Sequence, residues 1–376
     1  MIPYVEIKNA ERVTIGIIDT ARSVIWHSVY YGVGDFEIYA QATPQNVELL
    51  QAGNYVTRQN NDEIGVIEDV VFDFTVQDGY MITATGRFAK SLLDRRLIYK
   101  LSGTTNTPTI LSGKVEVAVR KTVQDNAISC SFDSRRNMPI LGLAALKGLT
   151  PIIVDENGNA AQKQVSYQNL LEYTDSVLKE YGLSSKIIYN DSNKMLLYSV
   201  YAGDDRSTDN TAGNEPIVFS IEFDNLNSSN YQYSDKTLKN AALIGGAGSE
   251  LERFYSLLTS GNSGLQLREI FVDASSINRT YKEDGSDEEH TYTDAEYTEM
   301  LNQQGLNTLN KHIITEAFTG DINVSFGLWQ YGRDFFLGDI VTIQDNMINK
   351  YINARITEAT EVQDENGYSV DVVFGE

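Results

Sequence analysis

A similar pattern of residues appears near both ends of the chain, and it constrains the fold more than any other feature. The first copy has an opening strand at Gly34-Asp35, an alternating run over residues 64–76 and a tight turn at Asp78-Gly79. The second copy has the same parts in the same order, at Gly338-Asp339, residues 352–362 and Asn366-Gly367. Such internal similarity predicts one structural unit used twice. Because Asp-Gly and Asn-Gly are common hairpin turns, two unrelated hairpins remain an alternative interpretation.

The composition favours strands and turns over helices. The 376 residues include 22 Tyr and 28 Gly but only 6 Pro, which is typical of a β-rich protein with many turns. The length predicts two or three domains. We expect a first β domain with a helical insertion over residues 1–145, a small α+β domain of a helix and a hairpin over 146–215, and a second β domain over 216–376 with an inserted long helix at 293–314. The expected fold class is therefore β-rich α+β, with two β-barrel or sandwich modules.

Local patterns place the elements inside these domains. In the run over 64–76 the even positions are mostly apolar, which predicts a half-buried strand, or two strands joined by a bulge near Glu68. Residues 166–182 carry the strongest helix signal, with Gly182 just past its end. Thr293 and Glu296 form a capping box at the start of the long helix. Shorter helices are predicted over residues 44–51, 87–97 and 115–123, the last with Ser112 as its N-cap.

Charge and cysteine content exclude several classes of protein. The formal net charge is −22, so the surface should repel nucleic acid, since phosphate binding needs Lys and Arg. Cys130 is the single cysteine, so no intrachain disulfide forms and synthesis in a reducing cytoplasm fits. No apolar run reaches the ~20 residues that span a bilayer, and no secretory signal is visible at the N-terminus.

No motif predicts a catalytic, cofactor or metal site. The histidines His27, His290 and His312 have no zinc-ligand spacing. The segment 245–248 (Gly-Gly-Ala-Gly) superficially resembles a phosphate loop, but it lacks the Lys-Ser/Thr pair and the full glycine fingerprint, so a tight turn is predicted. The acidic loop 283–290 does not have the spaced Asp pattern of an EF-hand, which favours a solvated turn over a Ca²⁺ site.

The remaining charged residues indicate no particular chemistry. Two small basic clusters, Arg95-Arg96 and Arg135-Arg136, are expected to pair with nearby carboxylates. With 52 acidic residues in the chain, residue type alone leaves a two-carboxylate hydrolase open. No pair of carboxylates stands out from the others.

Four segments resemble siphophage tail proteins of the gene-product-thirty-seven-like family. The matching segments are residues 24–26 with 30–39, residues 86–96, residues 222–226 and residues 336–341. The resemblance covers essentially the whole chain in the same order, and the stretch from Phe88 to Arg96 is its most specific part. Proteins of this family are similar to the baseplate-hub and tail-associated proteins at the distal end of the tail.

The resemblance implies a non-enzymatic structural protein of the virion, made in the host cytoplasm. It implies a homotrimeric hub whose subunits each contribute two tail-tube-like β domains, to match the sixfold tube above. The implied partners are the distal tail protein, the tail tube protein, the tape measure protein, tip fibre or lysin proteins, and phage DNA that passes through the lumen without specific binding. No cofactor is implied. Because the chain ends directly after its last expected strand, we expect no cell-wall-cleaving or receptor-binding extension.

Two alternatives from other functional classes stay open at this point. The first is a cell-wall glycan hydrolase with an unassigned carboxylate pair, and the second is a monomeric adhesin that binds host carbohydrate. A hub predicts a trimer, a hydrolase predicts activity that one carboxylate substitution abolishes, and an adhesin predicts a monomer with affinity for glycans. The acidic surplus fits a DNA conduit, because a negative lumen would let the phosphate backbone slide without binding.

Overall fold

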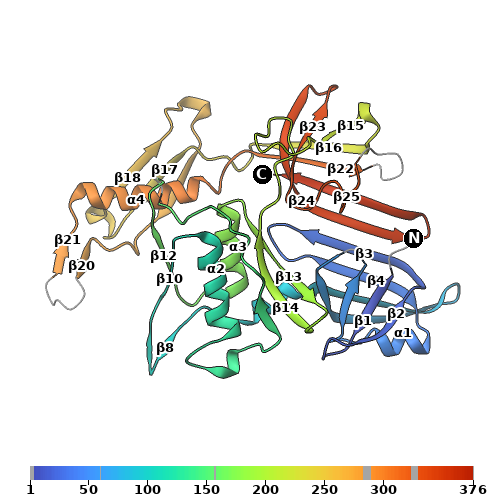
Figure 1. Ribbon diagram of the computed structural model, residues 1–376. Coiled ribbons are helices and arrows are strands. Elements are labelled where there is room, and N and C mark those ends of the chain that lie inside the picture. Colours follow the sequence, from blue (N-terminus) through green and yellow to red (C-terminus); the bar gives the residue numbers. More distant parts are fainter. Residues whose placement is uncertain (1–3, 60, 156–157, 283–288, 323–328, 376) are drawn as a thin grey trace. The chain divides into compact units, whose positions relative to one another are not determined.

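The computed structural model describes residues 4–59, 61–155, 158–282, 289–322 and 329–375 (Figure 1). The chain divides into two compact units. Unit 1 consists of Met1–Asn230 and Phe318–Glu376, and unit 2 of Tyr231–Ala317. Within the described ranges, no helix is both long enough and apolar enough to cross a membrane.

The first β module of unit 1 is a sheet with the strand order β3-β4-β7-β6-β5-β1-β2. Buried and exposed residues alternate along its central strands, so Phe36, Ile38 and Ala40 of β4 face the core. Its elements are β1 (Val5–Lys8), β2 (Thr14–Ile18), β3 (Ala21–Val29), β4 (Asp35–Gln41), α1 (Pro44–Leu49), β5 (Tyr55–Arg58), β6 (Ile64–Thr75) and β7 (Gly79–Phe88). The predicted short helix is confirmed as α1, capped by the side chain of Thr43.

A helical and α+β segment follows in the chain and forms its own apolar core. Helices α2 and α3 contribute buried residues to the same core as β13 and β14. The elements are η1 (Ala89–Arg95), β8 (Leu101–Ser102), β9 (Thr105–Asn106), β10 (Thr109–Ser112), α2 (Val115–Val123), η2 (Gln124–Ile128), η3 (Ser134–Arg136), β11 (Leu141–Leu143), β12 (Gln162–Val165), α3 (Leu170–Glu180), β13 (Ser184–Asn190) and β14 (Met195–Tyr201).

The three helix predictions in this segment have different outcomes. The helix expected over 87–97 is wrong, because strand β7 continues to Phe88, which pairs with Gly65, and only a 3-10 helix follows. The helix predicted over 115–123 is confirmed as α2, but its expected N-cap Ser112 is wrong. It ends strand β10, and the helix begins after Lys114. The helix predicted over 166–182 is confirmed as α3, and Gly182 past its end has the left-handed φ of +68°.

The second β module of unit 1 has the strand order β16-β22-β25-β24, and β23 lies between β24 and β15. The buried rings of Phe219, Phe335 and Phe374 form its aromatic core. The elements are β15 (Val218–Ser220), η4 (Ile221–Phe223), β16 (Leu226–Ser234), β22 (Thr315–Ile322), β23 (Ile340–Asp345), β24 (Lys350–Asp364) and β25 (Gly367–Gly375). Strands β16 and β22 lead into and out of unit 2.

Unit 2 is a three-stranded sheet of order β18-β17-β19 with helix α4 on one face. Tyr297 and Leu301 of α4 pack on Ala242 and Ile244 of β17. The elements are β17 (Ala241–Gly245), η5 (Glu250–Glu252), β18 (Tyr255–Thr259), η6 (Gly264–Gln266), β19 (Glu269–Asp273), β20 (Thr280–Lys282), β21 (Glu289–Thr291) and α4 (Asp294–Leu309). The predicted capping box at Thr293 is confirmed.

The two β modules have equivalent topology. Five strands follow one another in the chain as β3, β4, β5, β6, β7 and as β16, β22, β23, β24, β25, and the spatial orders β3-β4-β7-β6-β5 and β16-β22-β25-β24-β23 correspond strand by strand. Each module ends in a long hairpin with a bulge, between Ile67 and Asp69 in β6 and between Ile356 and Glu358 in β24. The predicted bulge near Glu68 is therefore confirmed, and the chain does use one unit twice.

The repeat as expected from the sequence is nevertheless wrong in its first strand. The strand that begins at Asp35 pairs with the last strand of its module, β7, whereas the strand after Asp339 pairs with β24. The true counterpart of β4 is β22, and that of β23 is β5. A Gly-Asp opening marks a turn into a strand but carries no information on which neighbour the strand pairs with.

Candidate functional site at the joint between the β modules

The long strand β24 is shared by both modules. Its first part, from Lys350 to Arg355, pairs with β23 of the second module. Its last part, from Glu358 to Gln363, pairs with β3 of the first module. Figure 1 shows the red strands β24 and β25 beside the blue strand β3. Main-chain hydrogen bonds therefore join the two modules edge to edge into one continuous sheet.

A buried ion pair connects the two modules on the core side of this joint. Arg58 of β5 donates to Glu361 of β24, and each side chain is 7% exposed. The hydroxyl of Tyr368 donates to the other oxygen of Glu361, and the Arg58 guanidinium lies 5.5 Å from the Trp26 ring centroid. Burial, followed by the charge of Glu361, raises the pKa of Tyr368. Such a pair is stable only while both charges stay matched.

A histidine connects the modules on the opposite face of the sheet. His27 of β3 lies between Asp35 of β4 and Glu358 of β24, with each ring nitrogen 3.1 Å from a carboxylate oxygen. Burial alone would lower the pKa of His27, but the hydrogen bonds to both carboxylates outweigh burial and raise it. The protonated imidazole therefore fits this position.

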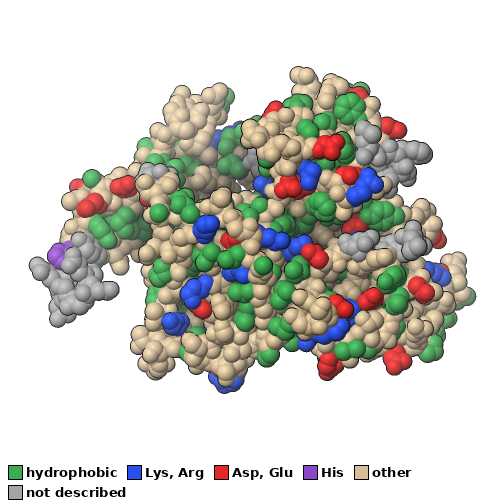
Figure 2. Space-filling model, viewed as in Figure 1, with side chains coloured by type: hydrophobic (Ala, Val, Ile, Leu, Met, Phe, Trp, Pro, Cys, Tyr) green, Lys and Arg blue, Asp and Glu red, His purple; other side chains and the backbone are tan. Residues whose placement is uncertain are grey.

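That face of the joined sheet is rich in acids. Alternation along the strands and the pairing register place the following carboxylates on the same side as His27: Asp35, Glu37, Asp69, Asp73, Glu358 and Asp371. Arg87 lies among them and pairs with Glu68, Nε to Oε2 at 2.8 Å. Figure 2 shows basic and acidic side chains intermixed on the face of the molecule that is in view.

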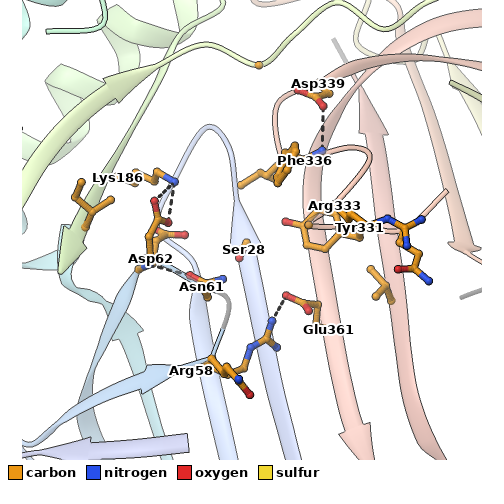
Figure 3. A pocket seen from close by; sticks show the side chains of 18 of the residues that line it. Ser28, Arg58, Asn61, Asp62, Lys186, Tyr331, Arg333, Phe336, Asp339 and Glu361 are labelled. Carbon is orange, nitrogen blue, oxygen red and sulfur yellow. Dashed lines mark hydrogen bonds and ion pairs between the residues drawn. The ribbon is translucent and has the colours of Figure 1, made fainter. Parts of the chain in front are cut away.

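A polar cleft of about 1940 Å³ lies beside the joint (Figure 3). Its walls come from the end of β5, from the loop before β6, from β13 and β14, and from the segment around Tyr331. Lys186 closes one side through a 2.7 Å ion pair with Asp62. Burial raises the pKa of Glu63 to about 7, although the charge of Lys186 opposes this shift. Burial also raises the pKa of Tyr331.

Several of the carboxylates that line the cleft are already paired: Asp62 with Lys186, Asp339 with Arg206, and Glu361 with Arg58 and Tyr368. Across the part of the chain that the structure describes, no three His, Cys, Asp or Glu side chains gather in a way that could hold a metal ion. The ion pair of Arg58 with Glu361 thus connects the two modules at the edge of this cleft.

The sequence features singled out earlier lie in structural roles. The segment 245–248 is the end of β17 followed by a bend, where a tight turn was predicted. Arg253 donates to the carbonyls of Gly245 and Gly246, and a Cβ on Gly246 would lie 2.6 Å from the Tyr297 hydroxyl. His312 lies just past α4, 2.9 Å from the Thr308 carbonyl, and His290 lies in β21. Residues 283–288 of the acidic loop lie outside the described residues.

The two basic clusters differ from each other. Arg135 pairs with the local carboxylate of Asp133 at 2.9 Å, as predicted. Arg136 instead is buried over the Tyr99 ring, 4.0 Å from its centroid, and donates to carbonyls of residues 97 and 99. Arg96 donates to the carbonyl of Arg136. For Arg96 and Arg136 the expected carboxylate partners are therefore wrong, because main-chain carbonyls satisfy them.

Comparison with known proteins gives one family and several related folds. A family model described as siphovirus ReqiPepy6 Gp37-like protein matches residues 4–376. No curated protein sequence matches the chain. The tail protein from Neisseria meningitidis MC58 is similar in structure, with a TM-score of 0.56 and 11% identity over 100% of this chain and 96% of that one.

Two further solved structures show the same likeness. The 43 kDa tail protein of prophage MuSo2 from Shewanella oneidensis has a TM-score of 0.56 and 11% identity, covering 99% of this chain and 98% of that one. Prophage tail protein gp18 from Listeria monocytogenes EGD-e has a TM-score of 0.50 and 10% identity, covering 99% and 94%. At these identities the likeness concerns the fold, and it confirms the expected β-rich fold of phage tail proteins.

Proposed function

Because this chain belongs to the siphovirus Gp37-like family and is thus a structural component of a phage tail, we propose that it forms a trimeric ring at the tail tip that continues the tail tube. The ring acts as a conduit for DNA and as the attachment point for tip proteins. In this proposal the chain is not an enzyme. Segments 1–145 and 216–376 each carry one ring module, and the α+β segment 146–215 lies between them in the chain.

The observation that supports this proposal is the joint between two equivalent modules. Within one chain, the outer edge of β3 pairs with the distal half of β24. The counterpart of the β3 edge is the edge of β16 that faces away from β22. The counterpart of the paired edge of β24 is the edge of β6 that faces away from β7 after the bulge, over residues 69–75. Among the strand pairings of the described residues, neither has a partner strand. Open edges of this kind are normally covered, and a head-to-tail contact that repeats around an axis closes a ring.

Three copies of a two-module chain supply six equivalent modules, which matches the sixfold symmetry expected of a tail tube. We propose the tail tube protein, the distal tail protein and the tape measure protein as neighbours along the axis, and tip fibre or lysin proteins as attached partners. The chain acts in the virion after synthesis in the host cytoplasm.

The acidic face of the joined sheet supports the conduit. In a ring closed through the sheet edges, the core side of each module points outward and the face with Asp35, Glu37 and Glu358 lines the lumen. Carboxylates repel the phosphate backbone, so DNA passes without the cation release that binding needs. Debye screening acts over about 8 Å at physiological salt, so repulsion close to the wall persists.

The mass of the full chain in solution tests the proposal. Native mass spectrometry or light scattering should show three times the 42.0 kDa chain mass at high protein concentration. A strict monomer would contradict the ring. A monomer with measurable affinity for glycans would support the adhesin, and cleavage of peptidoglycan that Glu63→Gln abolishes would support the hydrolase.

A further inference from the structure

We infer that neighbouring copies join through the β6–β7 hairpin of one chain and the β16 edge of the next, and that aromatic contacts replace there the ion pair of the joint within the chain. This inference rests on the proposed ring. It assigns the occupant of an exposed apolar surface, the hairpin tip, to a second copy of the same chain.

The hairpins of the two modules align residue by residue from their bulges. Ile67 precedes the bulge in β6 and Ile356 precedes it in β24. Five positions further on, Phe72 of β6 corresponds to Glu361 of β24. Cross-strand partners agree with this alignment, since Phe72 lies opposite Ile82 and Glu361 opposite Val370.

The same alignment places Phe74 at the position of Gln363 and Tyr80 at the position of Tyr368. Phe74 lies opposite Tyr80 and Gln363 opposite Tyr368 in the two ladders. The first hairpin therefore carries Phe72 where the second hairpin carries Glu361, and both hairpins carry a tyrosine at the position of Tyr368.

The two hairpins differ in how much of this surface is covered. Glu361 is only 6% exposed, because Arg58 and Trp26 of the first module lie against it. Phe72, Phe74 and Tyr80 are 52%, 59% and 64% exposed. A cluster of large exposed aromatics is typical of an interaction surface, and the equivalent surface within the chain is covered by a neighbouring module.

The surface of the second module that would contact the β6–β7 hairpin of the next copy also differs from its counterpart in the first module. Gly65 and Ala354 occupy equivalent positions, each two residues before its aligned isoleucine. Val56 of β5 lies opposite Gly65, and Val341 of β23 lies opposite Ala354, so these two valines are equivalent as well. The counterpart of Arg58 is therefore Ile343, which pairs with Phe219 of β15.

Directly after β15, in η4, Ile221 and Phe223 are each 52% exposed. At the position of the Arg58 guanidinium the second module therefore has the buried, uncharged Ile343, and the exposed apolar side chains are those of Ile221 and Phe223 in η4.

This difference gives the ring a fixed order of modules. If the second hairpin docked on this surface of the second module, Glu361 would be buried without Arg58. If the first hairpin docked on Arg58, the guanidinium would be buried against Phe72. Both combinations leave an uncompensated buried charge. The correct order of modules is therefore specified partly because the incorrect pairings are destabilised. The two kinds of joint must therefore alternate.

The first experiment compares the mass of the full chain with that of Phe72→Glu/Phe74→Glu. Phe271→Glu serves as a matched control, because Phe271 in unit 2 is also 52% exposed. We expect trimers of the wild type and the control, and a monomeric double variant with unchanged circular dichroism and unfolding temperature. If the double variant stays trimeric, the ring stands and this joint is wrong. If the wild type is a strict monomer, the ring itself is contradicted.

A second experiment tests the pairing of strands directly. Asp73→Cys in β6 is combined with Ser228→Cys, Ser229→Cys or Asn230→Cys in β16, and the native Cys130 is buried and unpaired. Opposed strand positions bring Cβ atoms within disulfide range. We expect disulfide-linked oligomers on non-reducing gels from at least one combination and none from the single variants. If every combination stays uncrosslinked in a trimeric protein, the assignment of β16 is overturned.

Discussion

The imidazole of His27 contacts the carboxylate of Glu358 across the joint between the two β modules, Nε2 to Oε2 at 3.1 Å. Its Nδ1 lies equally close to Asp35 of its own module. One side chain thus connects strands that are far apart in the sequence, and its charge depends on pH near neutrality.

We expect this contact to stabilise the chain more at pH 6 than at pH 8. The pKa of His27 is raised in the folded state by the two carboxylates, so its contribution is complete below the unfolded value of about 6.5 and is lost as pH rises through the folded pKa. Because the three side chains are partly exposed, the effect should not exceed about 1 kcal/mol. Chemical unfolding of wild type and His27→Gln at both pH values checks this. His312→Gln is the control, and an equal difference at both pH values would contradict the prediction.

Glu63→Gln should stabilise the protein at pH 8 and change little at pH 5. Burial raises the pKa of Glu63 to about 7, so ionisation at pH 8 costs folding free energy that a neutral amide of the same shape avoids. The gain should be on the order of 1–3 kcal/mol. Thermal unfolding across this pH range measures it. A loss of stability at both pH values would show that the carboxylate makes a favourable contact in its charged form.

Arg58→Met should destabilise the chain by about 3–5 kcal/mol, because it leaves Glu361 buried without its partner. The double variant Arg58→Met/Glu361→Met should recover much of this loss, since both charges are then absent. Denaturant unfolding of the full set, with Lys121→Met in the exposed pair with Asp125 as control, separates the two effects. The control should change stability by less than about 1 kcal/mol. If the double variant is no more stable than Arg58→Met, the cost does not come from the unpaired carboxylate.

Reversing acids on the face of the joined sheet that carries His27 should create DNA binding, if this face lines the proposed lumen. We expect the wild type to leave double-stranded DNA free at low salt, and Asp35→Lys/Glu37→Lys/Asp73→Lys to retard it, with an affinity that falls steeply as salt rises. Asp125→Lys/Asp191→Lys/Glu299→Lys carries the same charge change on other exposed positions. Mobility-shift titration of both sets measures the difference. Equal retardation by both would show that net charge alone decides, and not the acidic face.

The elements of the hairpins could be predicted from the sequence, but their partners could not. The alternation over residues 64–76 predicted a strand and offered a bulge near Glu68 as one of two interpretations, because the side-chain period is encoded locally. The counterpart of β4, in contrast, is β22, and unit 2 separates β22 from its neighbour β16. In the sequence, a repeat is recognised by elements that follow one another at similar spacing. The insertion of unit 2 changes that spacing in the second module.

The site residues at the joint were missed for a related reason. Arg58 and Glu361 are separated by 303 residues, and each alone looks like a surface charge. One signal was available: Glu361 occupies a position in β24 where the alternation calls for an apolar, core-facing residue. A charge at a buried position of a strand predicts a buried partner, although the sequence does not say which residue provides it.

Unit 2 enters the second module between β16 and β22, where the first module has only the short connection between β3 and β4 over residues 30–34. The five-strand frame is the same in both modules, so the frame does not require what is inserted there. The connection between the first two strands of the module is therefore an insertion site for a whole unit. A phage tail protein of this family can therefore exchange the inserted unit for another at this place, while the five-strand frame keeps its strand order and register.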